Sequence, residues 1–217
     1  MNDNDAMQLK FVNKRGHITI TGKKIPHWDQ ACCVQFVTFR LADSLPQSKL
    51  QEYRQTKCQW MESHPKPWDE QTQKEYDHTF TEVMDKWIDA GYGECILKDK
   101  RVRDILADVI MHYDGDQYVI HAYVIMPNHV HVLMTPADGY TIQEIVGDWK
   151  KFSSRGINKI LDRRGPLWER ERFDHLVRDA AGYATILSYI ERNPENLPQD
   201  RYSLYTTTGR VWRKRSY

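Results

Sequence analysis

The sequence predicts an α+β fold: an antiparallel sheet of four or five strands with helices packed on one face. Residues 118–126 and 129–135 are rich in β-branched and aromatic residues, which are typical of strands. Only the break around Pro127 and Asn128 separates the two runs, and so short a connection joins antiparallel strands. Strands that alternate with helices would also fit a parallel sheet. The short break favours the antiparallel one.

The other elements follow from hydrophobic periodicity and from residues that end helices. A first strand is predicted at residues 32–41. Helices are predicted at residues 50–61, 69–90, 101–113, 141–161 and 180–192. Asp179 is a suitable N-cap for the last helix, and Pro194 disfavours helical geometry at Asn193, so that helix should end there. The chain then divides into an N-terminal arm (1–27), a main domain (28–197) and a basic, loop-like C-terminal tail (198–217).

Composition indicates a single-domain cytoplasmic protein. The chain has 217 residues, 40% of them hydrophobic, which is enough to bury a substantial core. No apolar run approaches the ~20 residues of a membrane span, and the N-terminus lacks the apolar region of a secretory signal. The four cysteines show neither a disulfide framework nor a zinc-binding spacing, which indicates reduced thiols. The net charge of +1 does not itself indicate a nucleic-acid partner.

The segment Pro127-Asn128-His129-Val130-His131 is the first candidate site. Side chains alternate between the two faces of a strand, so His129 and His131 should point to the same side. Such a pair can bind a divalent metal ion. A bare pair of histidines on a strand is more often solvated than metal-binding, so the pattern needs a second motif to carry a function.

That second motif is Tyr189-Ile190-Glu191-Arg192-Asn193-Pro194. Tyr189 and Asn193 are four residues apart on the predicted helix, and hence on one face, one turn from each other. A phenol and an amide oxygen so placed could supply a nucleophile and a third metal ligand. The alternative is structural, with Tyr189 a half-buried aromatic residue and Asn193 a helix cap.

Together these motifs resemble the single-tyrosine HUH transposases, and most closely their REP-associated tyrosine transposase (RAYT) branch. The resemblance extends over residues 26–197 and rests on several motifs in order. These are the strand 35–41, His129 with His131, the helix segment Trp149-Lys150-Lys151-Phe152, Gly165-Pro166-Leu167-Trp168, Arg178-Asp179, and Tyr189 to Pro194. It implies a ferredoxin- or RRM-like fold and a helical insertion at residues 47–93.

The resemblance also implies the roles of the site residues. Tyr189 would be the nucleophile, and His129, His131 and Asn193 would bind the metal ion. A phenol with a solution pKa of ~10 needs help to lose its proton during attack, and it can hold a 5′-phosphate covalently. A metal ion with mixed nitrogen and oxygen ligands would stabilise charge on the phosphate, and Mg²⁺ or Mn²⁺ suits such a site.

Cations interleaved with aromatic residues between the two motifs predict contacts with single-stranded DNA, because phosphates need cations and unstacked bases need planar surfaces. The candidate DNA-binding residues are Lys150, Lys151, Arg155, Arg164, Trp168, Arg170, Arg172 and Arg178. The structural alternative is a solvated helix face, with Trp168 as a core anchor.

The resulting hypothesis is a metal-dependent single-stranded DNA endonuclease and strand transferase. The resemblance implies hairpin-forming DNA, such as REP-like palindromes, as the substrate, and hence a cytoplasmic, nucleoid-associated protein. It favours a monomer that acts in cis, with a homodimer that exchanges the tyrosine helix as the alternative. A catalytically inactive, domesticated DNA- or RNA-hairpin-binding protein is the second hypothesis. A histidine-triad hydrolase is set aside, because Leu133 stands at the third histidine position.

Overall fold

The computed structural model describes residues 9–13, 19–21, 27–65, 68–76, 79–80 and 83–207. Much of the predicted N-terminal arm, and residues 208–217 of the predicted tail, lie outside these residues. The described strands are β1 (Thr19–Thr21), β2 (His27–Asp29), β3 (Gln35–Arg40), β4 (Tyr118–Ile125), β5 (His129–Pro136), β6 (Phe173–Leu176) and β7 (Ser203–Thr206). The helices are α1 (Gln47–Ser63), α2 (Glu70–Tyr76), α3 (Val83–Asp89), α4 (Lys100–Met111), α5 (Ile142–Ile160) and α6 (Ala180–Arg192), with short 3₁₀ turns η2 (Ile96–Lys98) and η3 (Gln199–Arg201).

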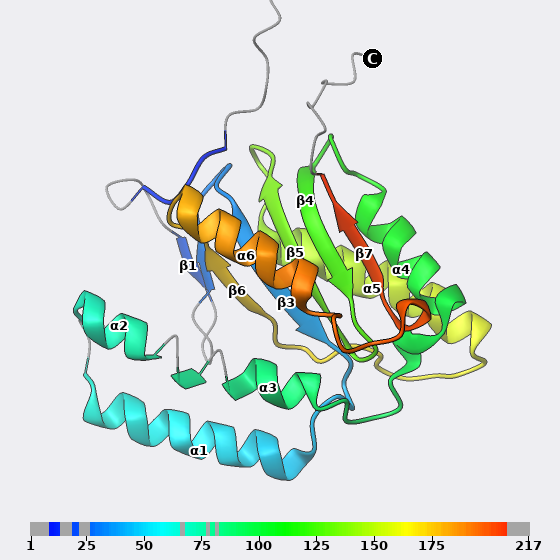
Figure 1. The fold of residues 1–217 in the computed structure, drawn as a ribbon, viewed down its shortest axis with the longest axis horizontal. Coiled ribbons are helices and arrows are strands. Elements are labelled where there is room, and N and C mark those ends of the chain that lie inside the picture. Colours follow the sequence, from blue (N-terminus) through cyan, green and yellow to red (C-terminus); the bar gives the residue numbers. More distant parts are fainter. Residues whose placement is uncertain are drawn as a thin grey trace, which may run out of the picture.

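The main sheet confirms the predicted α+β fold. Its five strands have the order β6-β3-β5-β4-β7, and every neighbouring pair is antiparallel (Figure 1). The chain order β3-α4-β4-β5-α5-β6 is that of a ferredoxin-like fold, with β7 added at the β4 edge. The break at residues 126–128 joins β4 and β5 as antiparallel neighbours, as its length predicts.

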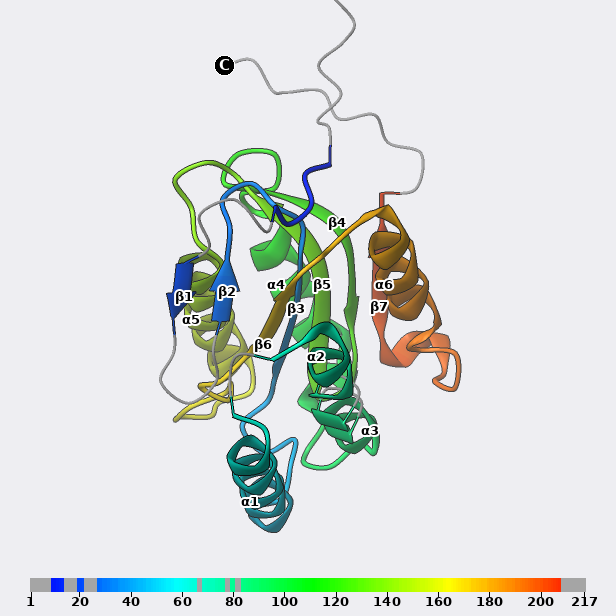
Figure 2. The ribbon, with the colours of Figure 1, turned by 90° about the vertical axis from the view of Figure 1, so that its left-hand side faces the viewer.

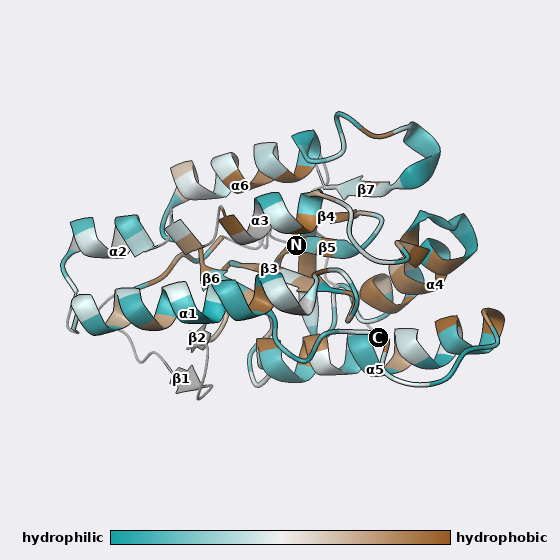
Figure 3. Ribbon diagram, turned by 90° about the horizontal axis from the view of Figure 1, so that it is seen from below, coloured by the Kyte–Doolittle hydropathy of each residue, from teal (hydrophilic) through white to brown (hydrophobic). Residues whose placement is uncertain are grey.

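Helices lie on both faces of this sheet. The predicted packing on one face holds for α4 and α5, whose apolar residues share a core with the sheet (Figures 2 and 3). Helix α6 lies on the opposite face, where Ile190 is fully buried against Val124 and Leu133. The strands account for this arrangement, because both faces of β4 and β5 are buried over their full length and each face therefore needs a cover.

Helices α1 to α3 lie at the end of the sheet where β3 ends and β5 begins (Figure 1). They share a small core of Leu45, Leu50, Tyr53, Phe80 and Ile88. The sequence predicted one helix over residues 69–90, whereas the structure describes two separate helices, α2 and α3. Phe80, between them, is buried in the small core against aromatic side chains of α1.

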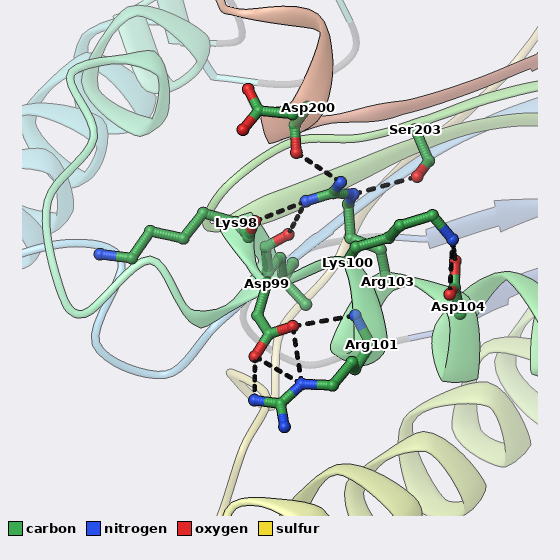
Figure 4. A network of polar contacts seen from close by, with 9 residues as sticks. Lys98, Asp99, Lys100, Arg101, Arg103, Asp104, Asp200 and Ser203 are labelled. Atoms are coloured by element: carbon green, nitrogen blue, oxygen red, sulfur yellow. Dashed lines mark hydrogen bonds and ion pairs between the residues drawn. The ribbon is translucent and has the colours of Figure 1, made fainter.

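Strand β7 corrects the prediction that the tail from residue 198 onwards is loop-like. It pairs with β4, and Tyr205 stacks on Tyr123 with ring centroids 5.3 Å apart. Arg103 of α4 holds this segment in place (Figure 4). Its buried guanidinium donates to the Asp200 carbonyl oxygen at 2.6 Å and to Ser203 Oγ at 3.0 Å. It also donates to carbonyl oxygens of η2, so one side chain links η2, α4 and the C-terminal strand.

In the part of the chain that the structure describes, none of the helices is long and apolar enough to cross a membrane.

Candidate active site

Strand β5 places both candidate histidines on the face covered by α6. His129 lies opposite Arg40 and His131 opposite Thr38 on β3, and each histidine is 1% exposed. The alternating residues Val130 and Val132 point into the core under α4 and α5. The predicted alternation therefore brings the two imidazoles side by side, with ring centroids 4.7 Å apart.

His131 contacts Tyr189, which confirms that the fold brings the two sequence motifs together. The hydroxyl oxygen of Tyr189 lies 3.2 Å from Nε2 of His131, and Thr38 Oγ1 lies 2.7 Å from Nδ1. Phe36 stacks on the imidazole and meets the Tyr189 ring edge-on, which fixes both rings. With the imidazole proton on Nδ1 and donated to Thr38, Nε2 can accept the phenolic proton of Tyr189.

His129 has a different set of partners. The Nδ2 amide of Asn128 donates to the carbonyl oxygens of Ile88 at 2.9 Å and Tyr92 at 3.3 Å, which fixes the amide orientation. Asn128 Oδ1, an acceptor, is 2.8 Å from His129 Nδ1, so Nδ1 carries the proton and donates it. The lone pair of Nε2 is therefore available. Among the described residues, this buried atom has no hydrogen-bond partner.

Burial keeps both imidazoles neutral. It lowers the pKa of His129 well below its ordinary value, with a smaller contribution from neighbouring His131. Burial also lowers the pKa of His131 to about 3. A neutral imidazole has one lone pair that can accept a proton or bind a metal ion, so the site retains this capacity at physiological pH.

An open cleft of about 710 Å³ runs along α6 beside these residues. It is lined by Asp89, Ala184, Thr185, Ser188, Tyr189, Arg192 and Asn193. The buried Oδ1 of Asn193 has no hydrogen-bond partner among the described residues. Tyr189 and Asn193 thus share one face of α6, as their spacing predicts, and that face opens onto the cleft.

Asp89 is a site residue that the sequence analysis missed. Its Oδ1 lies 3.5 Å from His129 Nε2, and burial raises the pKa of its carboxyl to about 6. No spacing rule could have found it, because α4 and β4 separate it from His129 along the chain.

The residues present fit a divalent ion, although no group of three or more His, Cys, Asp or Glu side chains with metal-site geometry occurs among the described residues. The unpartnered atoms His129 Nε2 and Asn193 Oδ1 are both lone-pair donors. A mixed nitrogen and oxygen set is suited to Mg²⁺ or Mn²⁺ with further positions open to substrate. The metal-binding roles of His129, His131 and Asn193 stay predictions.

Most of the predicted DNA-binding residues lie on the surface. The exposed ones are Lys151, Arg155, Arg164, Arg170 and Arg178. Phe152 of α5 is 46% exposed, and the cationic groups of Lys151 and Arg155 lie over its ring. A second cleft, of about 430 Å³, is lined by Gln143, Val146, Gly147, Lys150, Arg170, Glu171 and Arg172.

Trp168 and Lys150 have structural roles instead. Trp168 is 6% exposed, and its indole donates to Ser153 Oγ inside the core, so it is not available to stack on a base. The ammonium of Lys150 donates to the carbonyl oxygens of residues 169, 170 and 171. Burial lowers its pKa to about 8. Arg172 is also largely buried and pairs with Asp174 at 3.4 Å.

The structure separates the α5 surface from the cleft. Helices α5 and α6 lie on opposite faces of the sheet (Figure 2), so the exposed cations of α5 do not face Tyr189. Their place between the two motifs in the sequence therefore did not predict their place in space.

Comparison with known proteins finds one matching family and several similar solved structures, two of which are named below. The family described as "Transposase IS200 like" matches residues 93–193. A REP-associated tyrosine transposase bound to a REP hairpin is similar at 14% identity, over 81% of this chain and 74% of that chain, with a TM-score of 0.46. A transposase candidate from Deinococcus radiodurans R1 is similar at 15% identity, over 84% and 97% of the two chains, with a TM-score of 0.35. No protein of curated function matches the sequence.

The two structural similarities are low, and the resemblance to transposases rests on the family match together with the motifs. The matched residues include β4, β5, α5, β6 and α6, and thus His129, His131, Tyr189 and Asn193. Residues 93–193, just under half of this chain, are thus similar to the IS200-like transposase family.

Proposed function

We propose that this protein cleaves and rejoins single-stranded DNA through a covalent bond between Tyr189 and a 5′-phosphate. The contact between the Tyr189 hydroxyl and His131 Nε2, at 3.2 Å, carries the proposal. The phenol proposed as the nucleophile lies beside a neutral imidazole, at the edge of an open cleft.

The reaction is a transesterification. The Tyr189 oxygen forms a bond to phosphorus, and the bond from phosphorus to the 3′-oxygen of the preceding nucleotide breaks. The phenol loses its proton, for which His131 Nε2 is the nearest acceptor while no ion is bound there and water is the acceptor otherwise, and the leaving 3′-oxygen gains one. The phosphotyrosine conserves the bond energy, so an incoming 3′-hydroxyl can reverse the step and join a new strand.

Mg²⁺ or Mn²⁺ completes the proposed site. His129 Nε2 and Asn193 Oδ1 have unpartnered lone pairs that fit such an ion, and His131 would contribute Nε2. A bound ion would polarise the scissile phosphate and stabilise the charge that develops there. His131 Nε2 has a single lone pair, so it cannot bind an ion and accept the Tyr189 proton at the same time. Metal binding would therefore release the Tyr189 hydroxyl towards the cleft.

The proposed substrate is hairpin-forming single-stranded DNA such as a REP-like palindrome. Arg192, which lines the cleft and is exposed, is suited to a phosphate beside Tyr189. The exposed cations and Phe152 of α5 would contact DNA on the other face of the sheet, where a hairpin stem or a flanking strand could bind. Since His131 and Tyr189 meet within one chain, we propose a monomer that acts in cis.

The test is cleavage of labelled hairpin oligonucleotides in Mg²⁺ or Mn²⁺, with products resolved on a denaturing gel that retains protein-linked DNA. Wild type should give a metal-dependent covalent adduct, and Tyr189→Phe should give none. Tyr183→Phe is the matched control: Tyr183 is on the same helix and packs against His121, away from His131, so its adduct yield should equal that of wild type.

Binding of several hairpins without an adduct from wild type would contradict the proposed reaction. That result would favour the second hypothesis, a domesticated protein that binds DNA or RNA hairpins without cleaving them.

A further inference from the structure

The helical insertion reaches the proposed metal site through Asp89. This residue is the last of α3, and it lies in the wall of the cleft shared by Tyr189 and Asn193. Its carboxylate oxygen Oδ1 is 3.5 Å from Nε2 of His129. The Asp89 side chain is 43% exposed towards the cleft, whereas the His129 side chain is 1% exposed.

Two acceptors face each other in this contact. His129 carries its proton on Nδ1, because Nδ1 must donate to Asn128 Oδ1, so Nε2 presents a lone pair. An ionised carboxylate has acceptors only. The contact therefore lacks a donor, and it becomes favourable only when a positive group lies between the two atoms.

A divalent ion matches the separation better than a proton does. Hydrogen bonds between nitrogen and oxygen are about 2.7–3.2 Å long, and the observed 3.5 Å exceeds that range. Two ligands of one ion, each bound at about 2.1 Å and separated by 90–110° at the metal, lie about 3.0–3.4 Å apart. The distance of 3.5 Å lies just above this range.

The contact is held in place from both sides. Asn128, which fixes the His129 tautomer, also donates its amide to the carbonyl oxygens of Ile88 and Tyr92, on either side of Asp89 along the chain. Ile88 is fully buried in the core that α1 and α3 share. The insertion and the histidine strand are thus joined at the residues that flank the contact, so Asp89 cannot easily move away from His129.

We infer that Asp89 is a ligand of the divalent ion, supplied by the helical insertion in addition to His129, His131 and Asn193. This inference rests on the metal site of the proposed function. It assigns the insertion a direct part in that site, because a carboxylate adds the negative charge that three neutral ligands lack. Hard cations such as Mn²⁺ and Mg²⁺ prefer oxygen ligands of this kind.

The test is binding of Mn²⁺ to the full chain after removal of metals with EDTA. Affinity is measured by isothermal titration calorimetry, and bound Mn²⁺ by loss of the signal of the free ion in electron paramagnetic resonance. Asp89→Ala should lower the affinity at least about tenfold, since ligand-shell changes commonly cost this much. Asp138→Ala removes the same charge from an exposed turn beyond the other end of β5 and should bind like wild type.

His129→Ala separates the outcomes. Equal affinity in wild type and Asp89→Ala, with binding lost in His129→Ala, would overturn the role of Asp89 and leave the proposed metal site intact. Absence of Mn²⁺ binding in wild type up to millimolar concentration would instead overturn the metal site itself. Near-ultraviolet circular dichroism of each variant shows whether the aromatic packing around Phe36 and Tyr189 is retained.

Discussion

The two faces of the central sheet differ in how their polar groups are satisfied. Under α5, the Trp149 indole donates to the Tyr118 hydroxyl, which donates in turn to the Ile110 carbonyl oxygen. The Trp168 indole donates to Ser153 Oγ, which donates to the Trp149 carbonyl oxygen. Under α6, by contrast, buried polar atoms of His129 and Asn193 have no hydrogen-bond partner among the described residues.

This difference separates stability from function within one sheet. Buried polar groups are nearly always paired, because an unpaired one costs about 1–3 kcal/mol. On the α5 face, the chain of Trp149, Tyr118, Trp168 and Ser153 obeys this rule, as expected of a stabilising core, although the buried Oδ1 of Asn158 on α5 has no hydrogen-bond partner among the described residues. The α6 face breaks it at the residues that the motifs single out, which is expected where a ligand supplies the missing partner.

The largest change in stability should come from the hydrogen-bonded core under α5. Trp168→Ala should lower the free energy of unfolding by about 3–5 kcal/mol, because it leaves a cavity beside Phe39 and leaves Ser153 without its indole donor. Urea unfolding followed by circular dichroism measures the change. Phe152→Ala, on the exposed side of the same helix as Ser153, is the control and should change stability little. A loss below about 1 kcal/mol for Trp168→Ala would deny that this face stabilises the fold.

Lowering the pH should reduce the free energy of unfolding, because the buried histidines of the α6 face resist protonation. Burial lowers the pKa of His121 in the folded protein to about 4, while unfolded histidine has a pKa of about 6.5. The unfolded chain therefore takes up the proton first. The stability that His121 contributes is complete above pH ~6.5 and falls by about 3 kcal/mol as the pH drops to ~4.

The variant His121→Gln isolates this contribution. Its unfolding free energy should depend less steeply on pH between ~6.5 and ~4 than that of wild type. His129 and His131 respond in the same direction and keep part of the slope in the variant. An unchanged slope would show that His121 is not neutral and buried in solution.

Arg103→Met tests whether the hydrogen-bonded core under α4 and α5 extends to the β7 edge of the sheet. Loss of the guanidinium removes its bonds to Asp200, Ser203 and η2, and should cost about 2 kcal/mol. Amide hydrogen exchange in Ser203–Thr206 should become faster than in wild type. Arg101→Met, at an exposed site of the same helix, should leave exchange in β7 unchanged. Equal protection of the β7 amides from exchange in Arg103→Met and wild type would contradict the role of Arg103 in holding β7 in place.

The smallest expected change in stability is a gain, whereas the other variants lose stability. In Asp89→Asn, the new amide can donate to His129 Nε2, so the metal-free protein should gain about 1 kcal/mol of stability. Thermal unfolding in EDTA measures this gain. A loss of stability under these conditions would contradict the inference that Asp89 Oδ1 and His129 Nε2 face each other as two acceptors.

Much of the fold could be predicted from local patterns. The bounds of β4, β5, α5 and α6 agree with the predicted ranges to within a residue or so, because alternation, helical periodicity and the cap at Asp179 are local signals. Strand β7 was missed, since a short, polar edge strand has little pattern of its own and forms by pairing with β4. The break between α2 and α3 was missed too, as it depends on packing with α1.

The sequence by itself determined which residues share a face: His129 with His131 on a strand, and Tyr189 with Asn193 on a helix, because side-chain direction follows backbone periodicity. Only the tertiary structure decided that these two faces meet, that Trp168 and Lys150 are structural, and that Asp89 comes to His129. Such contacts join distant parts of the chain, and they are set by how the helices pack on the two sides of the sheet.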